Sequence, residues 1–269
     1  MTTQLTVATL NTRGLPLKGT RVAGRFAAIA AELDSSKIDL VCLQELFDYY
    51  HLRLLRKGMP SFPHVAYRPS LAGPRGGLVT LSRQPLSDTA YTRLPHASRR
   101  SGLPVRARVN ALHSGLLAVR LADSRVRVLN VHPTANTDGD WSEQNRFRQL
   151  QGDQLTALGQ VVAADMSTTV VCGDFNVARI STLHRALQQQ TGLRDAFDGQ
   201  CPPTFHAEYL PPGSTAQCID FILVNNAIEV NDVDLLFTDK HPLPSGPGYL
   251  SDHLGLLARL ELPTPTPSP

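Results

Sequence analysis

Short apolar runs recur along this chain, and segments of helical periodicity separate several of them. The runs occupy residues 5–10, 38–43, 126–131, 169–172 and 218–224. Apolar runs of roughly four to eight residues are typical of strands buried inside a sheet. Because strands and helices alternate along the chain, we expect an α/β fold.

The segment between the first two runs predicts a helix. Val22, Phe26, Ile29 and Leu33 recur there at helical spacing, so residues 19–35 should form an amphipathic crossover helix that covers one face of a sheet. The remaining pattern predicts helices over about 49–57, 141–164 and 180–189, and strands near 63–68, 77–83, 115–121 and 228–237. We expect the strands over 218–224 and 228–237 to form a hairpin through Asn225 and Asn226.

Two segments show no regular pattern. Residues 91–108 set five arginines, Arg93, Arg99, Arg100, Arg106 and Arg108, among Pro, Ser and Gly. We interpret this stretch as a cationic loop or distorted hairpin, which either is a solvated surface excursion or grips a phosphate or an anionic surface. Residues 239–248 are rich in proline, so we expect no regular element there.

Length and composition indicate one domain with a large core. The chain has 269 residues, of which 42% are hydrophobic and 18% charged, and its net charge is +3. We expect a single domain over residues 1–262 and a disordered, proline-rich tail over 263–269. The small net charge requires no polyanionic partner and leaves nucleic acid open. We expect a monomer.

Neither a membrane span nor a secretory signal is evident. No apolar stretch approaches the roughly 20 residues that cross a bilayer, and the first residues enter a strand without a charged and an apolar leader. We therefore expect a cytoplasmic protein, with secretion left open because a removed leader would leave no trace. Cys201 and Cys218 either pair or stay reduced, since spacing does not fix geometry.

The polar residues that end the apolar runs are the strongest chemical signal. Asn11, Glu45 and His132 each follow a run, and Gly173-Asp174-Phe175-Asn176 follows another. Asp220 lies in the last run, and Ser251-Asp252-His253 comes near the end of the chain. In sheets flanked by helices, ligands collect at strand ends, so these residues predict one site.

In this order the motifs resemble the metal-dependent endonuclease, exonuclease and phosphatase superfamily, which includes pancreatic deoxyribonuclease, abasic-site endonucleases, inositol-polyphosphate 5-phosphatases and neutral sphingomyelinases. The matching motifs extend from Asn11 to His253. The segments 43–48 and 76–83 look most similar to the sphingomyelinase branch. The resemblance implies a four-layer α/β/β/α sandwich of two stacked mixed sheets flanked by helices.

A phosphate ester is hydrolysed when charge on its oxygens is neutralised, a water is activated and the leaving oxygen is stabilised. A hard cation prefers oxygen ligands, and we expect Mg²⁺, with Mn²⁺ as the alternative, on Glu45 and Asn11, the pairing that the resemblance implies, and on Asp252. Asp174 is either the general base or a ligand to a second metal, and Asn176 should hold the water or a phosphoryl oxygen.

The resemblance implies that His132 and His253 bracket the phosphoryl group and hydrogen-bond its oxygens, and it leaves open whether one of them acts as an acid or base. A carboxylate keeps a histidine oriented and more basic, and Asp220 is the expected partner of His253. Many relatives carry a basic residue where this chain has Cys218. A phosphate contact is therefore either missing here or supplied by Arg75 or by the arginine-rich segment, through Arg106 and Arg108.

These residues predict a hydrolase that cleaves a phosphodiester by in-line attack of an activated water, with a sphingomyelinase-like phospholipid headgroup as the first expected substrate. A nuclease or DNA-repair phosphodiesterase with the same centre is the alternative. A catalytically silent binding module is a third reading, but such proteins usually lose metal and histidine positions, and this chain keeps them all.

Overall fold

The computed structural model describes residues 3–15, 21–97, 102–122, 126–210, 212–243 and 246–263. Arg99 and Arg100 of the arginine-rich segment lie outside these ranges. The tail predicted over 263–269 lies outside them as well, apart from Pro263.

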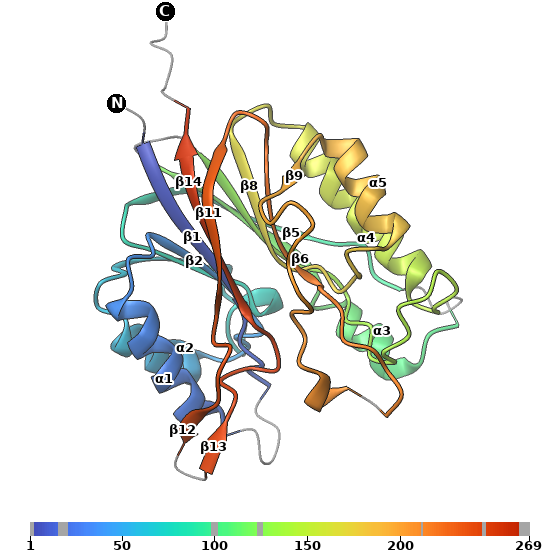
Figure 1. Ribbon diagram of the computed structural model, residues 1–269, viewed down its shortest axis with the longest axis horizontal. Coiled ribbons are helices and arrows are strands. Elements are labelled where there is room, and N and C mark those ends of the chain that lie inside the picture. The colour runs from blue at the N-terminus through green and yellow to red at the C-terminus, as the bar shows by residue number, and fades with distance from the viewer. Residues whose placement is uncertain are drawn as a thin grey trace, which may run out of the picture.

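The first sheet contains six strands in the order β11-β14-β1-β2-β4-β3. Its members are β1 (Thr3–Asn11), β2 (Leu40–Gln44), β3 (His64–Ala66), β4 (Val79–Ser82), β11 (Glu229–Leu236) and β14 (Gly255–Leu262). Strands β1 and β2 run parallel, joined by the predicted crossover helix α1 (Val22–Ser35). Together with α2 (Tyr49–Gly58), α1 covers the outer face of this sheet (Figure 1).

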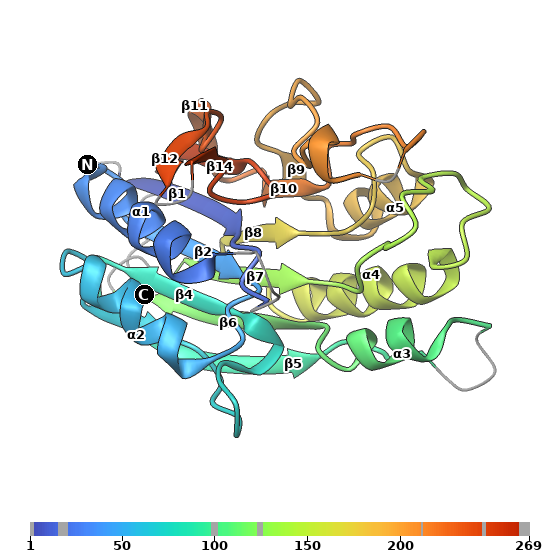
Figure 2. The ribbon, with the colours of Figure 1, turned by 90° about the horizontal axis from the view of Figure 1, so that it is seen from below.

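The second sheet also has six strands, in the order β5-β6-β7-β8-β10-β9. They are β5 (Leu86–Arg93), β6 (Gly115–Leu121), β7 (Arg127–His132), β8 (Thr169–Asp174), β9 (Arg194–Asp195) and β10 (Asp220–Val224). Strands β7 and β8 run parallel, connected through α4 (Arg148–Ala163). Helices α4 and α5 (Thr182–Thr191) cover the outer face of this sheet (Figure 2).

The two sheets stack face to face between the two helical layers, which confirms the predicted four-layer sandwich (Figure 1). The central strands β2, β8 and β10 are buried along their whole length, as expected for strands covered on both faces. Leu40, Val128 and Val171 belong to the apolar core that includes the space between the sheets.

A buried polar contact joins the two sheets. Gln44 Nε2 donates to Asn130 Oδ1 at 2.7 Å, and Asn130 Nδ2 donates to the carbonyls of Leu43 and Val79 at 3.0 and 3.1 Å. Buried amides must be paired in this way, because an unpaired one costs roughly 1–3 kcal/mol. Since Gln44 precedes Glu45 and Asn130 lies two residues before His132, this contact sets the relative position of two predicted site residues.

The predicted hairpin between residues 218–224 and 228–237 is wrong. Strand β10 pairs with β8 and β9 in the second sheet, whereas β11 pairs with β14 at the edge of the first. The adjacency of the two strands in sequence suggested pairing. However, β10 is buried along its whole length, while β11 has no fully buried residue, so they suit a central and an edge position respectively.

Three other predictions need correction. The irregular segment 91–108 contains the end of β5 and most of helix α3 (Val105–Ala111), and the proline-rich segment contains a two-stranded ribbon of β12 (His241–Leu243) and β13 (Gly246–Gly248). Helix α4 begins at Arg148 rather than Trp141, because Asp140, Ser142 and Asn145 accept hydrogen bonds from nearby backbone amides and form turns. Within the described ranges there are also two short 3-10 helices, η1 (Arg75–Gly77) and η2 (Ala207–Tyr209).

All four cysteines are free and buried, so Cys201 and Cys218 are adjacent thiols that share a hydrogen bond rather than a disulfide. No helix in the described part of the chain is both long and apolar enough to cross a bilayer.

Candidate active site

The strand registers bring the predicted polar residues to one edge of the sandwich. Asn11 lies opposite Gln44 at the ends of the parallel strands β1 and β2, so Asn11 and Glu45 are neighbours. In the second sheet, Asp220 lies opposite Asp174 where β10 begins and β8 ends. The parallel pair β1 and β2 and the antiparallel pair β8 and β10 thus bring side chains that lie far apart in the sequence to the same edge.

Asp174 lies at the centre of this group. Its Oδ2 accepts a hydrogen bond from Asn11 Nδ2 at 3.0 Å and lies 3.7 Å from Nε2 of both His132 and His253. Its Oδ1 accepts from the backbone N–H of Asn176 at 2.9 Å. Burial raises the pKa of Asp174 to about 7, despite the opposing charge of His253. A carboxylate with this pKa can accept a proton near neutral pH.

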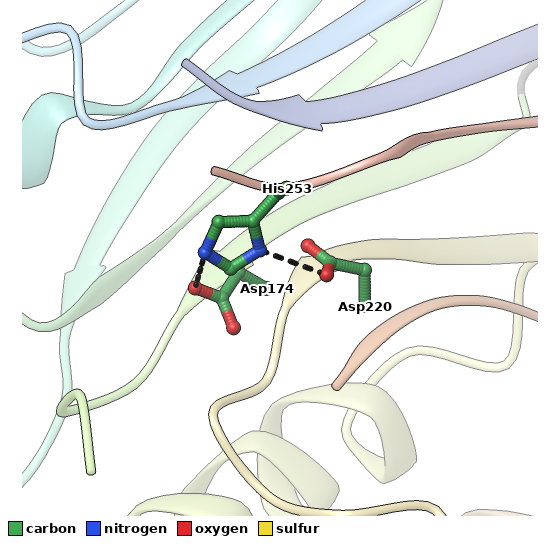
Figure 3. A group of neighbouring side chains, drawn as sticks. All are labelled: Asp174, Asp220 and His253. Carbon is green, nitrogen blue, oxygen red and sulfur yellow. Dashed lines mark hydrogen bonds and ion pairs between the residues drawn. The ribbon is translucent and has the colours of Figure 1, made fainter. Parts of the chain in front are cut away.

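His253 lies between two carboxylates, with Asp220 on one side and Asp174 on the other (Figure 3). Its Nδ1 is 2.9 Å from Asp220 Oδ2. Burial alone would lower the pKa of His253, but the charges of Asp220 and Asp174 outweigh it and raise the pKa to about 10. His253 is therefore a cation at neutral pH, able to donate a hydrogen bond to a phosphoryl oxygen.

His132 has the opposite electrostatic environment. Burial, followed by repulsion from the His253 cation, lowers its pKa to about 4. Its Nε2 is buried and has no hydrogen-bond partner among the described residues. A neutral imidazole with a free polar atom facing this group can pair with an incoming ligand.

Glu45 lies at the turn after β2 in a left-handed backbone conformation, with φ of 60°. Such a conformation costs a non-glycine residue of order 1–3 kcal/mol, and close packing holds it here: Leu46 N donates to Gly77 O at 2.9 Å, and a Cβ at Gly77 would lie 2.9 Å from Glu45 Cα. Burial and the nearby Asp252 carboxylate raise the pKa of Glu45. Asn11 Nδ2 lies 3.3 Å from Glu45 Oε1.

The remaining predicted residues flank this centre. Asp252 Oδ2 lies 3.3 Å from Arg13 Nε, and Asp252 Oδ1 lies 3.9 Å from His253 Nε2. Asn176 has φ of 55°, a conformation that asparagine tolerates better than most residues. Its Nδ2 donates to Pro133 O at 3.2 Å.

Two carboxylate groupings could hold a cation. Ligand atoms of Asp174, Asp220 and His253 lie within 4.8 Å of one another, but a metal-binding imidazole must be neutral, and both nitrogens of His253 face carboxylates. Glu45 and Asp252 form the second grouping, in which burial and then repulsion by the Asp252 charge raise the pKa of Glu45. A divalent cation would relieve that repulsion, and oxygen donors suit Mg²⁺.

Asn11 presents its amide nitrogen, not its oxygen, to Glu45 and Asp174, because its Oδ1 accepts from the backbone N–H of Arg13 at 3.0 Å. In this orientation Asn11 holds the two carboxylates in place.

A cavity of about 520 Å³ opens beside this centre. Glu45 and His132 form part of its wall, and Phe47 and His113 meet edge to face with ring centroids 5.9 Å apart. Arg75 also lines it, whereas Arg106 and Arg108 lie on α3 and do not. A second hollow of about 530 Å³ lies between α4 and α5 and contains none of the predicted site residues.

Several residues that support the site were not predicted. Arg13 pairs with Asp252 and stacks on the Tyr209 ring at 4.2 Å. Thr204 Oγ1 accepts from the backbone N–H groups of Ile219 and Asp220. A polar residue inside an apolar strand, as at Asn130, is a sequence signal that could have indicated a supporting role. Thr204 and Arg13 act through contacts between distant segments, which no sequence pattern predicts.

A model of the Endonuclease/Exonuclease/phosphatase family matches residues 8–253. A putative neutral sphingomyelinase of Drosophila melanogaster is 26% identical over 282 residues, which cover 96% of this chain and 61% of the relative, so the chain spans about three fifths of that protein.

Among solved structures, sphingomyelinase C from Streptomyces griseocarneus is similar with a TM-score of 0.69 and 18% identity, over 96% of this chain and 99% of that one. TDP2 from C. elegans is similar with a TM-score of 0.66 and 16% identity, over 96% of this chain and 75% of that chain.

Proposed function

Because the chain belongs to the endonuclease/exonuclease/phosphatase family, whose members are hydrolases acting on phosphodiester bonds, we propose that it is an Mg²⁺-dependent phosphodiesterase that cleaves a phospholipid headgroup. The observation that carries the proposal is the arrangement of Glu45, Asp174 and His253 at one edge of the sandwich, beside a largely apolar cavity.

Glu45 and Asp252 are the proposed metal ligands. The amide nitrogen of Asn11 hydrogen-bonds both Glu45 and Asp174 and so holds the Glu45 carboxylate in place. The bound cation would neutralise charge on the phosphoryl oxygens. This assignment fits the environment of Glu45, whose pKa is raised by burial and by the charge of the nearby Asp252 carboxylate.

Asp174 is the proposed general base. It accepts a proton from the attacking water, and the amide of Asn176, whose backbone N–H orients the Asp174 carboxylate, holds that water or a phosphoryl oxygen. His253, kept cationic by Asp220, donates a hydrogen bond to the phosphoryl group as negative charge develops there. His132 completes the bracket with its unpaired Nε2.

A lipid headgroup is the proposed substrate class for two reasons. The Drosophila relative is described as a sphingomyelinase. In addition, the cavity beside Glu45 combines apolar walls with the exposed guanidinium of Arg75, which suits a phosphate attached to an apolar body.

The test is a substrate panel assayed with EDTA and with added Mg²⁺. Mixed micelles containing sphingomyelin or phosphatidylcholine, a soluble aryl phosphodiester and a single-stranded oligonucleotide are compared at equal phosphate concentration. We expect Mg²⁺-dependent release of phosphocholine from the micelles. Cleavage of the oligonucleotide without release of phosphocholine would overturn the lipid assignment but leave the reaction type standing.

Glu45→Gln provides the matched test of the metal site, with Glu229→Gln as its control because Glu229 is exposed on the edge strand β11. We expect Glu45→Gln to lose activity and Glu229→Gln to keep it. Equal activity of the two variants would refute the assignment of Glu45.

A further inference from the structure

Exposed apolar side chains concentrate around the mouth of the cavity. Eight large apolar residues are exposed in the described part of the chain, and five of them belong to this region. Leu15 and Leu112 line the cavity, and Leu71 lies between two residues, Ser70 and Ala72, that line it. The other two, Val105 and Val109, lie on α3. Exposed apolar patches of this kind mark interaction sites more often than single scattered residues do.

Helix α3 presents these residues as a stripe. Val105, Val109 and Leu112 are spaced by four and three residues and so share one side of the helix; Val105 is 66% and Val109 is 49% exposed. The opposite side is buried, because Ala107 and Ala111 pack in a small core with Leu103, Phe147 and Leu150. The orientation of α3 is thus set by its buried alanines, and its valines face outward.

The helix extends this apolar surface away from the cavity. Its C-terminal end reaches the cavity through Asn110, Leu112 and His113, and in Figure 2 α3 lies beyond the tip of the β5 arrow. Leu71 is fully exposed, between Pro69 and Pro74, which form a β-bridge. A loop closed by this bridge and a helix therefore flank the opening with outward aliphatic groups.

Positive charge accompanies these apolar groups. Arg75 and Arg93 line the cavity and are exposed, and Arg106 is exposed on α3. Among the described residues that line the cavity, Glu45 is the only carboxylate. Aliphatic side chains with arginines beside them match a phospholipid surface, where acyl chains lie beneath phosphate groups. A nucleic-acid backbone would engage the arginines but would leave the exposed valines and leucines without an apolar partner.

We propose that α3 and the loop carrying Leu71 form the surface by which this protein docks on a phospholipid bilayer, with Leu71, Val105 and Val109 inserting among the lipids. The inference rests on the proposed function, because a bilayer-held substrate must meet the cavity at its mouth. Docking at this surface places the headgroup layer against Arg75 and Arg93, next to Glu45 and His132.

The test is co-sedimentation with vesicles of equal parts phosphatidylcholine and sphingomyelin, in EDTA so that no substrate is consumed. The docking variant carries Leu71→Ser, Val105→Ser and Val109→Ser. The control carries the same change at the three exposed apolar residues that lie outside this region, Tyr50→Ser, Met166→Ser and Ile180→Ser. We expect the docking variant to lose vesicle partitioning at least tenfold, and the control to lose less than twofold.

Both variants are also assayed on a soluble aryl phosphodiester with Mg²⁺, and neither should change its rate, because none of the six residues touches the centre. This arm reports the reaction alone. If the unchanged protein hydrolyses no soluble diester, the proposed function fails, and the vesicle result still decides the docking surface. Equal partitioning of the two variants, or binding of the unchanged protein to an oligonucleotide but not to vesicles, would overturn the proposal.

Discussion

Replacing Asp220 with asparagine should remove the charge that keeps His253 cationic, while leaving the shape of the side chain almost unchanged. Asp220 Oδ2 and His253 Nδ1 are 2.9 Å apart, and both residues are buried. Burial opposes the cation, yet the neighbouring carboxylates raise the pKa of His253 from 6.5 to about 10. At ~1.36 kcal/mol per pKa unit, this rise corresponds to about 5 kcal/mol of net preference for the cation, shared mainly between Asp220 and Asp174.

An opposite charge at this range shifts a pKa by about 1–3 units. We therefore expect Asp220→Asn to lower the pKa of His253 by about that amount, toward neutrality. Hydrolysis should slow by about 10- to 100-fold at pH 8, since a hydrogen bond from a charged donor contributes ~1.5–3 kcal/mol and a neutral imidazole replaces much of the cation.

The pKa of His253 can be measured by NMR titration of ¹³C- or ¹⁵N-labelled histidine. The rate of hydrolysis is measured with a soluble diester and Mg²⁺. Asp195→Asn is the matched control: Asp195 is a buried carboxylate on the neighbouring strand β9 that pairs with Arg179 and not with His253. If His253 still titrates near 10 in Asp220→Asn and the rate falls less than twofold, the proposed role of Asp220 is wrong.

The other predictions concern the metal site, pH and the backbone. Glu45→Gln should raise the Mg²⁺ concentration for half-maximal activity at least tenfold. It should leave the melting temperature in EDTA unchanged or higher, because it removes a buried carboxylate that Asp252 repels. A lower melting temperature in EDTA would contradict this. The metal-free folded state should lose stability as pH rises from 6.5 through about 10. Folding raises the pKa of His253, so the stabilisation by the His253 cation is complete below pH 6.5 and is lost as the cation loses its proton. In denaturant titrations at several pH values, His253→Gln should flatten this dependence. Activity should fall as pH drops through about 7, as Asp174 takes up a proton, and a rate that stays constant to pH 5 would argue against Asp174 as the base. Gly77→Ala should destabilise the protein by about 2 kcal/mol or more in urea unfolding, because φ is +67° and the added Cβ would overlap Glu45 Cα. Gly213 is exposed and has open space around it, so Gly213→Ala should cost less than half as much.

Most of what could be predicted about this fold came from the order of the polar residues that follow the apolar runs. Each of the runs that end at Asn11, Glu45, His132 and Asp174 forms a central strand, because a buried strand must be apolar and its polar terminus must face solvent or a ligand. The structure places these side chains together, and their chemical roles stay predictions.

Patterns along the chain could not reveal contacts between distant segments. Strand β11 follows β10 closely but pairs with β14, because the edge of the first sheet was free to accept an exposed strand. Helix α3 is short and half-exposed, so its periodicity is weak, and its alanines are buried against Leu103, Phe147 and Leu150. Thr204, which orients the backbone at Asp220, belongs to a loop with no regular pattern.

The proposed metal site is tested most directly by a crystal structure of the protein soaked in Mn²⁺, with anomalous differences used to locate the ion. We expect a peak within about 2.5 Å of a Glu45 carboxylate oxygen, close to Asp252, with His253 still hydrogen-bonded to Asp220. A peak held by Asp174, Asp220 and His253 without Glu45, or no peak at this edge of the sandwich, would contradict the proposed centre.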